Sequence, residues 1–486
     1  MERMTKGVIA SVQVNVPPEG SLRKARPLLL RRSTGVAIAL LSFLGGSLGA
    51  QSEGSGKALL VKAGKVLDVV AGQYRANQGI YIVGDRIKAI GDFDAVEKTA
   101  RRDISLIDLS RFTVLPGLID AHTHLLENGS ARVDDSVNLV IGVATQSTAY
   151  RALLGAEMGR EDLEAGITTV RDVGNSGLNG DVALRDAIDN GWVIGPRMVV
   201  STRALAAPGG QFHLTVQHDL QPMIDQEYAI IASPAEAKKA VAQAVYDGAD
   251  LIKVIMSEEI DREEMQAIVD QAHRSGKKVA AHAINDVQAM NAIDAGVDSI
   301  EHGYKLSNKT LQAMATKHIY LVPTDGSIET WTRTVTPQNP TEEEKKKADD
   351  LARNHIFPSR SQRLKRAIET GVPIAAGSDD YRDIPGMTRG QASVAVIHGY
   401  VESGTTPVEA IRSATIIAAD LLGWKDKVGS LEPGKFADII AVAGDPLKDI
   451  SEIERVQFVM KGGEIVKDLR NGEKPRTVPT PKHGWH

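Results

Sequence analysis

SPAEAKKAVAQAVYDGADLIKVIM, residues 233–256, is the stretch that decides the fold, because it holds one complete unit of helix, turn and strand. Ser233 can cap a helix, Pro234 is favoured in its first turn, and Glu236 stands three residues after the cap. Gly248 then ends the helix, and an apolar strand follows at once.

The same unit recurs through the middle of the chain. Asp261 and Glu264 predict the start of a second helix, and Gly276 predicts its end. Eight strands are expected in total, within residues 112–124 (FTVLPGLIDAHTH), 166–174, 195–201, 250–256, 278–283, 296–303, 319–323 and 371–379. Regular alternation of strands and helices predicts an α/β fold with a (β/α)8 TIM barrel over residues 116–424. An open, doubly wound parallel sheet is the alternative.

Both ends of the globular region show a different pattern. Residues 57–115 and 425–468 contain short alternating apolar runs separated by Gly and Asp turn signals, which predict strands and hairpins. Neither set has enough strands for a stable sheet, so we expect the two to form one small composite β-sandwich domain. The polar tail, residues 469–486, is expected to be disordered.

Residues 1–50 have the features of a leader and a signal peptide. A basic stretch, residues 23–32, precedes an apolar stretch, residues 33–48, that ends in small residues. The apolar stretch is shorter than the roughly 20 residues needed to cross a bilayer, so cleavage is favoured over a membrane anchor. The sequence therefore predicts an exported protein, periplasmic or secreted, with no stable membrane span after cleavage.

Composition narrows the function. The formal charge is 57 − 62 = −5, which argues against nucleic-acid binding because that needs a clustered positive surface. The chain contains no Cys, so disulfides, thiolate ligands and a Cys nucleophile are excluded. A bound metal ion would have to be held by His, carboxylate or modified Lys.

Six polar residues stand near the carboxyl ends of the predicted strands, where barrel enzymes place their catalytic groups. They are His122, His124, Lys253, His282, His302 and Asp379. Imidazole and carboxylate suit Zn²⁺ or a similar divalent ion. An ammonium group cannot bind a metal, but a neutral Lys253 could add CO2, and the resulting carbamate could bridge two ions. Zinc is the expected metal, with cobalt and manganese as alternatives.

The DAHTH motif, the strand lysine, the two later histidines and the AAGSD aspartate resemble the metal-dependent amidohydrolase superfamily over residues 58–467. The resemblance implies that His122, His124, Lys253 and Asp379 hold the more buried of two divalent ions. Carbamylated Lys253, His282 and His302 would hold the second ion. Asp379 would be the catalytic residue, moving a proton from a bridging hydroxide to the leaving group.

Two further motifs resemble the branch that contains prolidase-type dipeptidases and ochratoxin-hydrolysing amidohydrolases. They are EHGY at residues 301–304 and PGGQFH at residues 208–213. In that branch Tyr304 and His213 would bind the α-carboxylate of the substrate, with His218 as a substitute for His213.

Two long segments are expected to shape the substrate site, because extended loops in compact domains are usually functional. Residues 205–234 are expected to overhang it. Residues 325–354 contain a charge run that predicts an exposed helix, and Trp331 is expected to help wall the site. Arg382 could pair with an anionic group of the substrate or serve a structural role.

The resemblance implies a hydrolase that cleaves the amide bond before a C-terminal amino acid, in Xaa-Pro and other dipeptides or in N-acyl amino acids, including ochratoxin A. Hydrolysis of a cyclic amide, as in imidazolonepropionase, and a catalytically silent metal-binding protein remain alternatives. The expected partners are a small-molecule substrate and further copies of the chain, with an octamer as one possible assembly.

Overall fold

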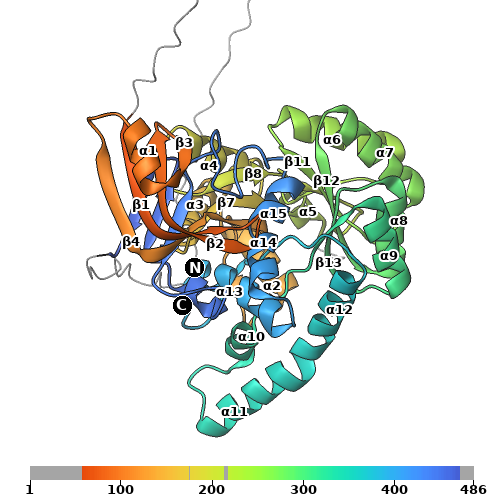
Figure 1. Ribbon diagram of the computed structural model, residues 1–486. Helices are drawn as coiled ribbons and strands as arrows, with labels where there is room; N and C mark the ends of the chain where they lie inside the picture. The colour runs from red at the N-terminus through yellow and green to blue at the C-terminus, as the bar shows by residue number, and fades with distance from the viewer. Residues whose placement is uncertain (1–56, 175, 213–216, 471–486) are drawn as a thin grey trace, which may run out of the picture. The chain divides into compact units, whose positions relative to one another are not determined.

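The computed structural model describes residues 57–174, 176–212 and 217–470 (Figure 1). The predicted leader and signal peptide, residues 1–50, and nearly all of the predicted polar tail lie outside the described residues. None of the described helices is both long and apolar enough to cross a membrane.

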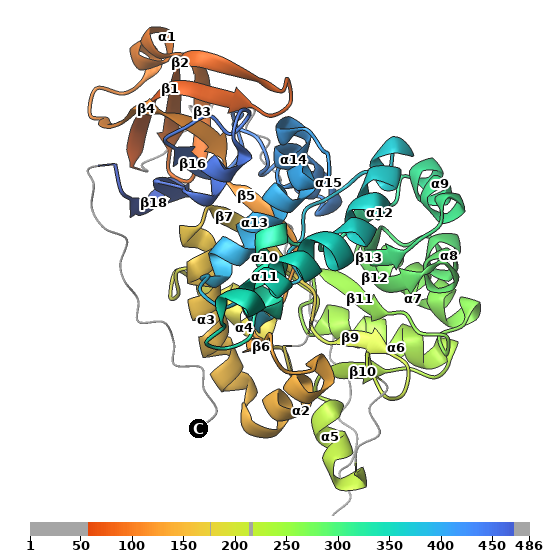
Figure 2. The same ribbon diagram turned by 90° about the horizontal axis from the view of Figure 1, so that it is seen from below.

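A seven-stranded sheet joins strands from both ends of the described chain. β1 (Ala58–Asp68) pairs antiparallel with β2 (Gln73–Val83) and parallel with β4 (Ser105–Pro116), and β16 (Ile439–Val442) adds antiparallel to β4. Figure 2 shows the late strands beside the early ones. Val61 and Ile439 belong to one buried apolar cluster, which draws on both ends. The other strands of this sheet are β3 (Arg86–Asp92), β17 (Phe458–Lys461) and β18 (Glu464–Asp468).

The middle of the chain forms two parallel sheets. One has the order β5-β7-β8 and the other the order β10-β9-β11-β12-β13-β14. Their strands are β5 (Leu118–Thr123), β7 (Ile167–Asp172), β8 (Arg197–Val200), β9 (Ala204–Ala206), β10 (Tyr228–Ile230), β11 (Leu251–Ile255), β12 (Lys278–Asn285), β13 (Ser299–Lys305) and β14 (Tyr320–Val322).

Backbone hydrogen bonds link the two parallel sheets on both sides. Asp250 N, just before β11, donates to Val200 O at the end of β8 at 2.7 Å. The other link passes through residues 371–379, where Ile374 makes a bridge to β14 and Ala376 O accepts from Ala121 N of β5 at 2.8 Å. Seven of the eight expected strands are therefore present, and the eighth position contributes a single bridge.

The predicted helix signals are confirmed. Ser233 caps α6 (Pro234–Tyr246) by accepting from Glu236 N. Asp261 and Glu264 form a reciprocal capping box at α7 (Arg262–Arg274). Helices α6 to α9 lie outside β11 to β13 (Figures 1 and 2). The other helices that alternate with the parallel strands are α3 (Thr148–Glu164), α4 (Gly180–Asp189), α8 (Asp286–Ala295), α9 (Asn308–Lys317), α12 (Phe357–Glu369), α13 (Arg389–Glu402), α14 (Pro407–Ser413) and α15 (Ile416–Leu421).

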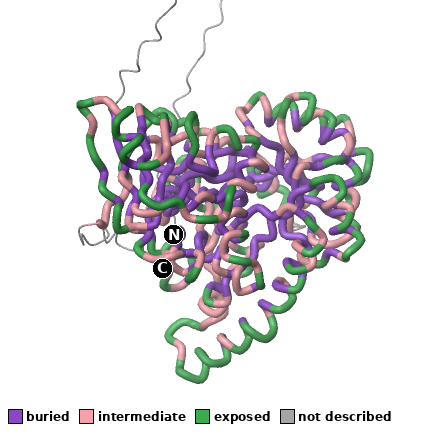
Figure 3. Tube along the Cα trace, in the orientation of Figure 1, coloured by how far each residue is buried: buried purple, intermediate pink, exposed green. Residues whose placement is uncertain are grey.

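Burial follows this arrangement: the buried part of the trace runs through the strands, and exposed residues mark the outer faces of the helices (Figure 3). Every residue of β5, β7 and β11 is buried, as expected for parallel strands covered on both faces.

The two long segments contain secondary structure of their own. Residues 205–234 were expected to form one loop, but they hold η1 (His218–Leu220), α5 (Gln221–Ile224) and β10, which pairs with β9. Residues 325–354 hold α10 (Ile328–Val335) and α11 (Glu342–Leu351), and the charge run of α11 is exposed as predicted. The remaining elements are α1 (Phe93–Thr99), β6 (Gly129–Ser130), α2 (Asp135–Thr145), η2 (Ala352–Ile356), β15 (Arg382–Asp383) and η3 (Ile450–Glu454).

Candidate metal centre

The six predicted ligand residues line one cavity of about 360 Å³. Each lies in or just after a parallel strand, so strands far apart in the sequence bring the side chains together. They are His122 of β5, His124 just after it, Lys253 of β11, His282 of β12, His302 of β13, and Asp379 after the bridge at Ile374.

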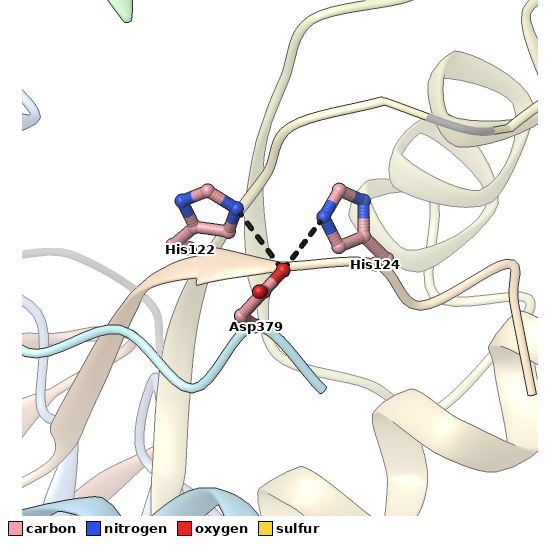
Figure 4. A group of neighbouring side chains, drawn as sticks. All are labelled: His122, His124 and Asp379. Carbon is pink, nitrogen blue, oxygen red and sulfur yellow. Dashed lines mark ion pairs between the residues drawn. The ribbon is translucent and has the colours of Figure 1, made fainter. Parts of the chain in front are cut away.

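His122, His124 and Asp379 form the tightest part of this group (Figure 4). The Nε2 atoms of His122 and His124 lie 3.3 and 3.2 Å from Asp379 Oδ1. Both imidazoles reach the same carboxylate because strand positions two apart face the same side. The buried Nε2 atom of His122 makes no hydrogen bond within the described structure. Two imidazoles and a carboxylate are suitable ligands for a divalent ion, and a ligand atom without a hydrogen-bond partner fits that role.

The other predicted ligands are in protonation states that suit metal chemistry. Burial lowers the pKa of the Lys253 amine to about 8, which makes the neutral form more accessible. Burial and the nearby Lys253 lower the pKa of His282 to about 3, so its imidazole is neutral at pH 7. The rings of His282 and His302 lie 4.4 Å apart between centroids. Neutral imidazoles can bind a metal without first losing a proton.

Asp379 is held as a carboxylate. Burial alone would favour its neutral form, but His302 and the nearby imidazoles of His122 and His124 hold its pKa well below the usual range. Its backbone is also fixed, because Asp379 N donates to His122 O at 2.7 Å. The side chain is therefore an anion aimed into the histidine cluster.

Glu301 positions His122 from behind. Its carboxylate accepts from His122 Nδ1 at 2.6 Å and from Arg171 Nη2 at 2.8 Å. The side chains of Glu301 and Arg171 are both buried. A proton on Nδ1 leaves Nε2 of the same ring free to bind a metal. Glu301 and Arg171 thus set the orientation and tautomer of His122, a predicted ligand.

Thr324 and Tyr304 hold the His302 side of the site. Thr324 Oγ1 lies 2.9 Å from His302 Nδ1 and 2.9 Å from the Tyr304 hydroxyl. His302, Thr324 and Asp379 all have positive φ, at 69°, 53° and 57°. Residues with side chains rarely adopt this conformation, and such strain persists where the surrounding structure enforces it, often at functional sites.

Gly377 allows the segment that carries Asp379 to approach β5 closely. A Cβ atom at this position would lie 2.5 Å from Val322 Cγ1 and 2.7 Å from His122 Cβ. Only glycine fits here without displacing a ligand residue.

Only some of the residues predicted to bind the substrate or wall its site are found at the cavity. Tyr304 lines the cavity, as do Trp331 and Arg382. Arg382 Nη1 lies 3.5 Å from a carboxylate of the protein itself, on Asp135. His213 lies outside the described residues, so its role stays a prediction. His218 is exposed in η1 and does not line the cavity, so it is a poor substitute for His213.

Reasoning from the sequence missed Arg171 and the positioning role of Glu301. A usable signal was present for Arg171, because its charge interrupts an apolar strand, as that of Lys253 does. The motif ITTVRD is entirely buried in β7, and a buried arginine in such a strand needs a carboxylate partner.

Comparison with known proteins identifies the family. Residues 113–466 match the model of the amidohydrolase family. The chain belongs to the amidohydrolase family. It is 30% identical to an ochratoxinase of Aspergillus niger over 392 residues, covering 73% of this chain and 75% of the relative. It is 25% identical to an imidazolonepropionase of Fusobacterium nucleatum over 404 residues, covering 75% and 84%.

Among solved structures, a Xaa-Pro dipeptidase with methionine bound in its active site has a TM-score of 0.70 and 32% identity, covering 84% of this chain and 99% of that one. The protein is thus a metal-dependent amidohydrolase. Members of this family generally use divalent metal ions, and the group formed by His122, His124 and Asp379 could hold one. The enzyme assignment disfavours the alternative of a catalytically silent binding protein.

Proposed function

We propose that this amidohydrolase cleaves the amide bond before a C-terminal amino acid, in dipeptides or N-acyl amino acids. The observation that carries the proposal is the position of Tyr304. Its hydroxyl lies 3.4 Å from His302 Nδ1, and the residue lines the cavity that the six predicted ligand residues also line. A phenol hydroxyl beside the reacting centre can donate to the carboxylate that follows the cleaved bond.

Two divalent ions, with zinc as the expected metal, would bind at the six ligand residues. His122, His124 and Asp379 would hold one ion, and His282 and His302 the other. Lys253, as a carbamate formed with CO2, would bridge the two. Ions bound there would polarise the scissile carbonyl and lower the pKa of the attacking water.

The chain's own groups would handle the proton. Asp379 is an anion whose Oδ1 lies within 3.3 Å of both nearby imidazole Nε2 atoms. It would accept the proton of the attacking water and deliver it to the amide nitrogen, which leaves as a free amine. Glu301 would keep His122 in the required tautomer throughout.

Hydrolysis of a cyclic amide is the second candidate, supported by the 25% identity with imidazolonepropionase. The metal ligands do not distinguish the two reactions, whereas recognition of a free carboxylate does. The similarity to an ochratoxinase and to a Xaa-Pro dipeptidase makes ochratoxin A and Xaa-Pro dipeptides test substrates for this chain.

We also propose the wider organisation expected from the sequence. The hydrogen bonds on both sides of the parallel sheets support a closed (β/α)8 barrel over residues 116–424. The mixed seven-stranded sheet supports a composite β-domain from residues 57–115 and 425–468. Export after cleavage of residues 1–50 and assembly into a homo-oligomer, such as an octamer, complete the proposal.

The test is mass spectrometry of products after the metal-loaded enzyme meets dipeptides, N-acyl amino acids, ochratoxin A and cyclic amides. Release of free C-terminal amino acids would support the proposal, whereas ring-opened products alone would favour the second candidate. Tyr304→Phe should chiefly raise KM for substrates with a free carboxylate. An equal loss on the corresponding C-terminal amides would contradict the role of Tyr304.

A further inference from the structure

Arg360 places a guanidinium group in the cavity next to Tyr304. The residue belongs to α12 and lines the same cavity as the metal centre. Its guanidinium carbon lies 4.2 Å from the ring centroid of Tyr304 and 4.5 Å from that of Trp331. Contact with two rings holds a flexible side chain in one place, and stacking of this kind does not use the N–H groups at the edge of a guanidinium.

The charge of Arg360 is only partly balanced by the protein. The nearest carboxylate is Asp325, whose two oxygens accept from Arg363 Nη2 at 2.7 and 2.6 Å. Arg360 Nη1 lies farther from this group, at 3.5 Å, and makes no hydrogen bond within the described structure. Two guanidinium groups thus share one carboxylate, which leaves a net positive charge beside Tyr304.

The other two arginines that line the cavity are balanced differently. Arg151 pairs with the buried carboxylate of Glu227 through two hydrogen bonds, at 2.5 and 3.2 Å. Arg382 lies 3.5 Å from Asp135, with no second arginine recorded at that carboxylate in the described part of the chain. Arg360 is therefore the cavity arginine best suited to take an anion from outside the protein.

We propose that Arg360 binds the free carboxylate of the substrate together with the Tyr304 hydroxyl, and so determines the preference for substrates that end in a carboxylate. The inference rests on the proposed function and names a residue that selects its substrate class. A guanidinium group offers paired N–H donors that match a carboxylate, and such charge-assisted bonds are roughly twice as strong as neutral ones. A cyclic amide without a carboxylate would leave this cation unpaired in a partly buried site, which disfavours such a substrate.

Binding of a product amino acid tests this role without requiring turnover. We would measure the Kd of L-methionine and of L-methionine amide by calorimetry on the metal-loaded full chain. The unmodified enzyme should bind the carboxylate at least tenfold more tightly than the amide. Arg360→Gln should remove most of that difference. Arg360→Lys keeps the positive charge but lacks the paired N–H donors of a guanidinium group, so it should retain part of the difference. Arg353→Gln is the matched control, because Arg353 is an exposed arginine earlier in the same helical segment that pairs with Asp349.

The outcomes separate this inference from the proposed function. Equal weakening of both ligands in Arg360→Gln, or full discrimination in that variant, would overturn the role of Arg360 even if amide hydrolysis is observed. Failure of the unmodified enzyme to prefer the carboxylate would overturn it as well. If no amide is hydrolysed but Arg360→Gln loses the preference and Arg353→Gln keeps it, the proposed reaction is wrong and the carboxylate site stands.

Discussion

Replacing Glu301 by glutamine should weaken both metal binding and folding, because among its buried partners this one carboxylate serves both the predicted ligand His122 and the charged Arg171. It accepts from His122 Nδ1 at 2.6 Å and from Arg171 Nη2 at 2.8 Å, and it is 0% exposed. Glutamine keeps a single acceptor oxygen and has no charge, so it cannot accept from His122 Nδ1 and serve Arg171 as the two carboxylate oxygens do, and the His122 tautomer is no longer fixed. Such a change in the partner of a ligand typically lowers metal affinity by about 10- to 100-fold.

The cost to stability follows from Arg171, which would keep its charge in a buried position. Breaking a buried ion pair by removing one partner costs about 3–5 kcal/mol. Arg171 retains hydrogen bonds to Ala121 O and Ser299 Oγ, so we expect a value near the lower limit, about 3 kcal/mol. This is a large share of the roughly 5–15 kcal/mol that stabilises a typical protein.

The assay pairs calorimetric titration of the metal-free protein with Zn²⁺ and thermal melting of the same metal-free sample. Glu227→Gln is the matched control, since Glu227 is buried and pairs bidentately with an arginine, Arg151, rather than with a metal ligand. Both variants should melt at lower temperature, but only Glu301→Gln should lose zinc affinity. Unchanged zinc affinity in Glu301→Gln, or an equal loss in Glu227→Gln, would refute the reasoning.

Three further substitutions test other parts of the structure. Lys253→Ala should abolish amide hydrolysis and deplete bound metal, measured by elemental analysis; full activity with two ions retained would contradict the carbamate. Gly377→Ala should cost about 1–3 kcal/mol through overpacking, and it should lower metal affinity because the added methyl group would lie 2.7 Å from His122 Cβ; normal zinc titration would contradict this. His398→Gln should lower the melting temperature at pH 5.5 and not at pH 8.5. The hydrogen bond to Glu454 raises the pKa of His398 above its usual value, so its stabilisation, about 0.5 kcal/mol for a partly exposed pair, is present at low pH and lost as pH rises through the folded-state pKa; a pH-independent difference would contradict it.

The elements that could be predicted from sequence are those set by local chemistry. The side chains of Ser233 and Asp261 cap their helices by accepting from the backbone N–H three residues later, and Gly248 ends a helix with a φ of 103° that favours glycine. None of these signals depends on the rest of the fold. Residues 205–234 were expected to overhang the site as an extended loop, and Gln211 and Phe212 do line the cavity. The secondary structure within the segment was not predicted, because β10 forms only by pairing with β9, a contact that joins residues 24 apart.

In the candidate site, too, the roles that depend on contacts between distant residues were the ones that the sequence did not reveal. The six predicted ligand residues stood out in the sequence because each places a polar group in or at the end of an apolar strand. The role of Glu301 was not recognisable, because adjacent strand residues normally point to opposite faces, and His302 already faced the site. A φ of 69° at His302 breaks this alternation, so that Glu301 contacts His122 while the ring of His302 lies 4.9 Å from the same imidazole between centroids. The backbone strain at His302 thus lets two consecutive side chains act on one ligand, one from behind and one from the cavity.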